Sequence, residues 1–185
     1  MNNSFKESFA PTVVLVSICL IASILLAATF QITEPLIEKI TIEMANAARS
    51  TVLPEASGFV EAKDVVLVDG VTEVYEAVNG VGYVITAQFK GFGGPVVVMT
   101  GLDPKGNIAG VKVTDASQET PGLGSKATNP DYLNQYVGAH AISSEPGSVD
   151  ATHISAVTGA TYTSRAVFSA ISVALQQFSE LGGGF

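Results

Sequence analysis

The chain has 185 residues, with nine Lys and Arg against 17 Asp and Glu and a formal net charge of −8. This acidic balance leaves no basic stripe to neutralise the phosphates of a nucleic acid, which excludes nucleic acid as a partner. The single cysteine, Cys19, lies in an apolar segment, so the rest of the chain can form no disulfide, thiolate zinc site, iron–sulfur cluster or c-type haem.

An apolar run near the N-terminus explains why mean hydropathy is positive, at +0.39, despite the charge. Residues 11–30 contain no charged side chain, and at about 1.5 Å per residue a helix of this length spans about 30 Å, the thickness of a bilayer's hydrocarbon core. A cleaved signal peptide is the alternative, but the run is longer than the usual apolar region of one, and residues 26–29 offer no clean cleavage site. The sequence therefore predicts an N-terminal tail and single transmembrane anchor over residues 1–32, with the lipid bilayer as a partner.

The next segment has helical spacing of its apolar residues, from Leu36 to Ala47. Thr33 can cap a helix and Pro35 suits a first turn, so we expect a stalk helix over residues 33–52. The remaining residues, 53–185, are expected to form one domain.

Five short runs rich in Val, Ile, Tyr and Phe predict strands, at residues 65–68, 73–78, 82–89, 95–102 and 108–114. Residues 103–107 join the last two and have the composition of a hairpin turn. Beyond them, Asn129 and Pro130 predict a short helix to Tyr136, and a closing helix has an apolar face made by Val167, Ile171, Ala174, Leu175 and Phe178. The expected fold class is α+β: one transmembrane helix, then a mixed, largely antiparallel sheet with flanking helices.

Residues 158–164 allow two interpretations. They can be a turn followed by a helix that Thr163 or Ser164 caps. Alternatively, the small residues Gly159 and Ala160 leave Thr161 sterically open just before a helix N-terminus, where unpaired amides and the helix dipole favour a phosphate.

Residues 118–124 are the second loop with a distinctive composition, because two glycines there allow close approach of the backbone to another group. The loop can equally be an ordinary surface connection. Two glycine-bearing loops can form opposite walls of a flat pocket, but the sequence does not reveal whether these two meet.

Three ordered motifs, together with the anchor, resemble a known family. The sequence resembles the FMN-binding domain family in three stretches: E-T-P-G-L-G at 119–124, T-G-A-T-Y-T-S at 158–164, and the residues from Gly91 to Asp103. This family is shared by the G subunit of the Rnf complex and the C subunit of the Na+-pumping NADH:quinone reductase. The resemblance covers nearly the whole chain and makes residues 53–185 the FMN-binding domain.

The resemblance implies that a flavin transferase joins FMN through its phosphate to the hydroxyl of Thr161, as an attachment point and not a catalyst. It also implies that Glu119, Thr120 and Leu123 line the flavin and that Gly122 and Gly124 shape their loop. Thr158, Gly159, Ala160 and Thr163 would surround the phosphate. The family's motif commonly has Asp where this chain has Ser155. No catalytic residue and no metal ligand is expected.

As function, the resemblance implies an electron-relay subunit of a membrane complex that couples ferredoxin and NAD+ chemistry to Na+ or H+ translocation. Its partners would be the other membrane subunits of the Rnf complex, with the N-terminus in the cytoplasm and the flavin domain on the outer face of the cell membrane. The short length favours the Rnf protein over the quinone-reductase protein. A different class of function, a membrane-anchored adaptor without a cofactor, explains the anchor and the charge but not the motifs.

Overall fold

The computed structural model describes residues 3–63, 65–145 and 151–182, in two compact units that divide after Met44. The first unit consists of most of helix α1 (Asn3–Val52), and the end of this helix belongs to the second. Within the described residues, α1 is the one helix long and apolar enough to cross a membrane, and the side chains of its most apolar stretch are exposed. The expected apolar anchor helix is confirmed.

Polar side chains in α1 are satisfied by the helix itself. The hydroxyls of Ser17 and Thr29 donate to the carbonyl oxygens four residues earlier, each at 2.8 Å. Thr33 does the same at 3.0 Å, so it does not cap a new helix, and that expectation is wrong. Residues 33–52 are helical as predicted, but they continue the helix that begins at Asn3. Pro35 therefore lies inside this helix and not in a first turn.

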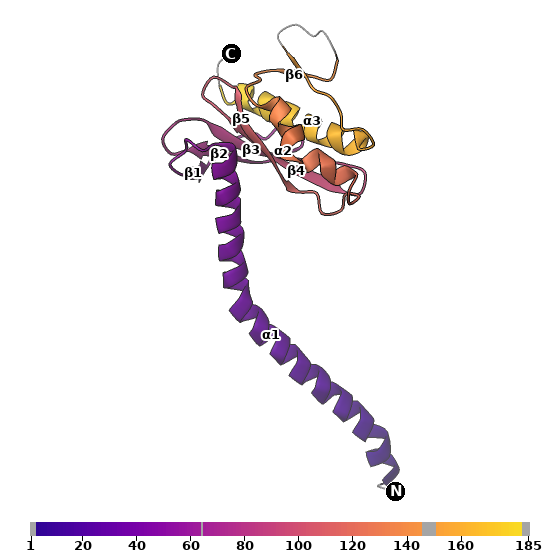
Figure 1. Cartoon of the computed structure of the whole chain (residues 1–185). Helices are drawn as coiled ribbons and strands as arrows, with labels where there is room; N and C mark the ends of the chain where they lie inside the picture. Colours follow the sequence, from indigo (N-terminus) through magenta and orange to yellow (C-terminus); the bar gives the residue numbers. More distant parts are fainter. Residues whose placement is uncertain (1–2, 64, 146–150, 183–185) are drawn as a thin grey trace. The chain divides into compact units, whose positions relative to one another are not determined.

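The second unit is built on a five-stranded antiparallel sheet in the order β1-β2-β3-β4-β5 (Figure 1). Its strands are β1 (Phe59–Glu61), β2 (Val71–Ala77), β3 (Tyr83–Lys90), β4 (Pro95–Leu102) and β5 (Ile108–Asp115). Four of these were predicted from their composition. A separate parallel pair, β6 (Ile142–Ser143) with β7 (Thr152–His153), makes the β-structure mixed, as expected.

The expected strand at 65–68 is absent, and β1, which the sequence did not indicate, occupies the edge of the sheet instead. A buried glutamine satisfies the backbone of this segment. The side-chain amide of Gln177 accepts from the Val68 N–H at 2.7 Å and donates to the Val66 carbonyl oxygen at 3.2 Å. Because these backbone groups bond to a side chain, the segment needs no partner strand.

Helices cover both faces of the sheet. The closing helix α3 (Thr161–Glu180) packs against β3 and β4 on one face, where all five residues of its predicted apolar stripe are buried (Figure 1). The last turn of α1 covers the other face, with Val52 and Leu53 packed on Val84 and Met99. Three short helices complete the α3 side: η1 (Gly124–Thr128), α2 (Pro130–Leu133) and η2 (Asn134–Tyr136), the last two matching the helix predicted there.

Candidate functional site

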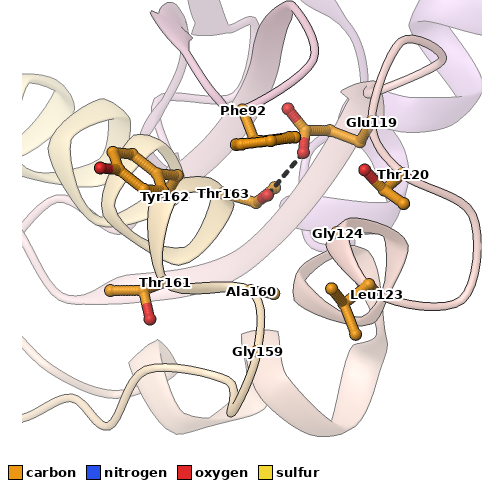
Figure 2. Close-up of a pocket in the computed structure, with 10 residues that line it drawn as sticks. All are labelled: Phe92, Glu119, Thr120, Leu123, Gly124, Gly159, Ala160, Thr161, Tyr162 and Thr163. Carbon is orange, nitrogen blue, oxygen red and sulfur yellow. Dashed lines mark hydrogen bonds between the residues drawn. The ribbon is translucent and has the colours of Figure 1, made fainter.

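A hollow of about 150 Å³ lies where three segments meet: the turn between β3 and β4, the loop after β5, and the start of α3 (Figure 2). The residues that line it are Phe92, Glu119, Thr120, Leu123, Gly124, Gly159, Ala160, Thr161, Tyr162 and Thr163. The two glycine-bearing loops therefore meet.

Thr161 is the first residue of α3, and its side chain is exposed. Ala160 is the N-cap and offers no side-chain hydrogen bond to the first turn. The first amide groups of a helix have no partner within it, so this end of a 20-residue helix keeps free N–H donors and a partial positive charge. The exposed hydroxyl of Thr161 thus stands where a phosphate is favoured.

Thr163 and Ser164, the two candidate capping residues, lie inside α3, so neither caps it and that interpretation is wrong. Their hydroxyls serve other groups. The Thr163 hydroxyl donates to Glu119, and the Ser164 Oγ accepts from the Val157 N–H at 3.0 Å. Helix α3 begins before either candidate capping residue. The chain turns into the helix at Gly159, whose backbone has the left-handed conformation with φ +81°.

Leu123 and Gly159 make the contact between the two loops. A Cβ at Gly159 would lie 3.2 Å from Leu123 Cδ1, so a side chain there would push the loops apart. Figure 2 shows Leu123 and Thr161 on different sides of the hollow, with Gly159 and Ala160 between them. Because residues 159 and 160 are small, the two loops approach closely, and the hollow is narrow as a flat ligand requires.

Glu119 is the one acidic residue of the hollow, and it is buried, with 4% of its surface exposed. Its Oε2 accepts a hydrogen bond from the Thr163 hydroxyl at 2.6 Å, drawn as a dashed line in Figure 2, and its Oε1 accepts from the Gly93 N–H at 3.1 Å. One carboxylate thus joins all three segments of the hollow.

Two aromatic residues at the hollow were not assigned a role from the sequence. Phe92 and Tyr162 are 68% and 65% exposed, and their ring centroids lie 6.1 Å apart at an interplanar angle of 49°. Both stand inside the motif stretches, and that position is the signal that could have found them. They add planar apolar surface beside Leu123, which suits an aromatic ring system.

Two of the residues expected at the site do not line the hollow. Gly122 has φ +75° and its N–H donates to Ser125 Oγ at 2.9 Å, so it forms the turn of the loop. Thr158 is exposed, one residue before the turn at Gly159. The structure brings together the other eight: Glu119, Thr120, Leu123, Gly124, Gly159, Ala160, Thr161 and Thr163.

Thr161 also borders a second, more open hollow of about 570 Å³, on the side of Arg165 and Ser155. Ser155 is exposed, and its backbone is held by the side chain of Gln135, which receives the Ser155 N–H at 3.0 Å. Tyr132 lines this hollow too, and burial raises its pKa, as it does that of its hydrogen-bonded neighbour Tyr136. Both phenols therefore stay neutral and serve as packing groups.

The side chains of the first hollow suit an organic phosphate ester better than a metal. No group of three or more His, Cys, Asp or Glu that could hold a metal ion occurs in the described part of the chain. An exposed hydroxyl beside free helix amides fits a phosphate, and the aromatic and leucine surfaces fit a flat ring. A flavin mononucleotide has both parts, so the residues present fit this cofactor.

Comparisons with known proteins agree with this chemistry. Residues 91–176 match the model of the FMN-binding domain family. The G subunit of the Na+-translocating ferredoxin:NAD+ oxidoreductase complex of Acetobacterium woodii is 33% identical over 197 residues, which cover 96% of this chain and 94% of that protein. The G subunit of the ion-translocating oxidoreductase complex of Methanosarcina acetivorans is 30% identical over 190 residues, covering 96% and 98%.

Among solved structures, the C subunit of the Na+-translocating NADH-quinone reductase of Parabacteroides distasonis is 24% identical, with a TM-score of 0.44. That match covers 59% of this chain and 62% of the other. The family model is the more informative comparison here, because the residues that it matches include every residue that lines the first hollow.

Proposed function

This chain belongs to the family of G subunits of ion-translocating oxidoreductase complexes, and we propose that it carries FMN esterified through its phosphate to Thr161 as a one-electron relay. The observation that carries the proposal is the position of Thr161, an exposed hydroxyl at the uncapped start of α3 and at the edge of the hollow.

The start of α3 would hold the phosphate. The free amides of its first turn donate to anionic oxygens, and the helix dipole favours negative charge at this end by about 0.3–1 kcal/mol. Thr161 itself provides the ester oxygen. It needs no activating base within this chain, because a separate flavin transferase would move FMN from a flavin dinucleotide. The phosphoanhydride bond of the donor would break, a nucleoside monophosphate would leave, and the Thr161 hydroxyl would give up its proton to the transferase or to water.

Phe92, Leu123 and Tyr162 would hold the flavin ring. Their apolar surfaces line the hollow and would contact the flat ring, and Leu123 also lies close to Gly159 of the other loop. FMN, when bound, supplies the ability to take up and release electrons singly. The protein contributes the position of the ring, the hydrogen bonds around it and the charge of Glu119.

The membrane part of the chain would serve as an anchor and not as an ion path. The apolar segment of α1 carries no Asp, Glu, Lys or Arg between residues 11 and 30, and ionisable side chains are what mark an ion pathway through a bilayer. The ion would therefore cross through other subunits of the complex. We propose that the N-terminus lies in the cytoplasm and the flavin domain on the outer face.

The test is the intact mass of the full chain purified from membranes of its own host, beside a Thr161→Ala variant. We expect the wild type to carry an added mass equal to esterified FMN and to give a fluorescent band in a denaturing gel. Thr161→Ala should lose both. Thr114→Ala is the matched control, since Thr114 is an exposed hydroxyl on β5 away from the hollow, and it should keep both.

An unmodified wild-type mass in a host with an active flavin transferase would refute the relay. Flavin that survives in Thr161→Ala would instead place the attachment elsewhere. Either result leaves the membership of the family intact, because that rests on the sequence comparison.

A further inference from the structure

Glu119 is a buried carboxylate without a cationic partner. It is 4% exposed, and it forms no ion pair with any Lys, Arg or His in the described part of the chain. Acidic side chains are seldom buried without such a partner, since removal of the charge from water is costly. An uncompensated carboxylate at the hollow therefore calls for a functional reason.

Hydrogen-bond donors from two other segments surround the carboxylate. Both of its neighbours donate to it: the Thr163 hydroxyl at 2.6 Å and the Gly93 N–H at 3.1 Å. Thr163 also lies in the first turn of α3, where the helix dipole stabilises negative charge.

Two glycines make room for this carboxylate. A Cβ on Gly91 would overlap Glu119 Oε1, and a Cβ on Gly124 would overlap Oε2. Three separate segments thus leave a space that the carboxylate fills. The carboxylate is therefore packed closely against the backbone of two glycines and held by hydrogen bonds from Thr163 and Gly93.

The charge faces the same hollow as Thr161. Addition of electrons to a flavin increases its negative charge, and a fixed carboxylate nearby opposes that increase. The opposition is stronger for a buried carboxylate than for one in water, because the Coulomb energy grows as the effective dielectric falls. We infer that Glu119 lowers the reduction potential of the flavin attached at Thr161 and so sets its place in the order of electron carriers.

This inference rests on the proposed attachment of FMN, and it is tested on the same full-length flavinylated protein. The experiment is a spectroelectrochemical titration of the midpoint potential for the wild type, Glu119→Gln and Glu180→Gln. Glutamine has the shape of glutamate and keeps an oxygen that can accept from Thr163 or Gly93, but it has no charge. Glu180 is an exposed acid at the far end of α3, about 28 Å from Thr161 at about 1.5 Å per residue.

We expect Glu119→Gln to shift the midpoint to a more positive potential and Glu180→Gln to leave it unchanged. The titration reads only molecules that carry flavin, so incomplete loading of a variant does not affect the result. An unchanged midpoint in Glu119→Gln, or an equal shift in Glu180→Gln, overturns the inference. Complete loss of flavin from Glu119→Gln also overturns it, in favour of a role in attachment. Absence of flavin from the wild type would instead be a failure of the proposed attachment.

Discussion

Gly93→Ala should open the hollow without replacing any side chain that lines it. A Cβ on Gly93 would overlap the backbone carbonyl oxygen of Gln118, so the turn between β3 and β4 and the loop after β5 cannot both keep their positions. Overpacking of this kind costs about 1–3 kcal/mol, and loss of the Gly93 N–H bond to Glu119 adds about 1.5–3 kcal/mol, as for a bond to a charged group. The sum is about 2.5–6 kcal/mol, a large part of the stability of a domain.

The assay is thermal unfolding of the detergent-solubilised full chain, followed by the near-ultraviolet circular dichroism of its five tyrosines, together with the flavin content by intact mass. Gly58→Ala is the matched control, because its Cβ would meet only Val78 Cγ2 at an ordinary 3.5 Å. We expect Gly93→Ala to unfold at a lower temperature and to carry less flavin, and Gly58→Ala to behave as the wild type. If Gly93→Ala matched the wild type in both readouts, the close approach of the two segments would not be what shapes the hollow.

Two further changes test the domain that supports the site. Gln177→Leu should lower the stability of this domain by about 2–4 kcal/mol, because the Val68 N–H and the Val66 carbonyl lose their partner. The measurement is amide hydrogen exchange, which should become faster at Val68 and stay unchanged in β4. Partial burial raises the pKa of Asp103, but hydrogen bonds from Asn107 and the Lys105 N–H outweigh it, so the pKa in the folded state is lower than usual. Its carboxylate therefore stabilises the fold fully above the unfolded pKa of about 3.9, and this contribution is lost as pH falls through the folded pKa. At neutral pH, the Asp103→Asn variant should unfold at a lower denaturant midpoint than the wild type. If the two midpoints still differed by the same amount in strong acid, this explanation would be wrong.

Local pattern was enough to predict most elements of the fold. The anchor follows from the uninterrupted apolar run at 11–30, and β2 to β5 follow from runs of β-branched and aromatic residues between turn residues. The apolar stripe of α3 repeats at helical spacing and was predicted with its buried face. In each case neighbouring residues in the chain supply the signal, because the periodicity of one element reflects the single surface that it buries.

Elements that depend on distant partners were not predictable in this way. The segment at 65–68 has the composition of a strand, but Gln177, more than 100 residues later, satisfies its backbone. Strand β1, by contrast, is only three residues long, too short for alternation to be visible. The side chain of Gln177 therefore explains why residues 65–68 form no strand. The free edge of β2 explains why β1 forms.

The sequence by itself indicated which residues form the candidate site. The order and spacing of the two motifs indicated Thr161 and the glycine-bearing loops, since small residues and a hydroxyl before a helix are properties of a few adjacent positions. Only the tertiary structure decided that the loops meet, that Phe92 and Tyr162 stand together, and that Glu119 bonds Thr163 and Gly93. The reason is physical: the environment of a buried charge is created by segments that fold against one another, and the spacing of residues along the chain carries no record of those contacts.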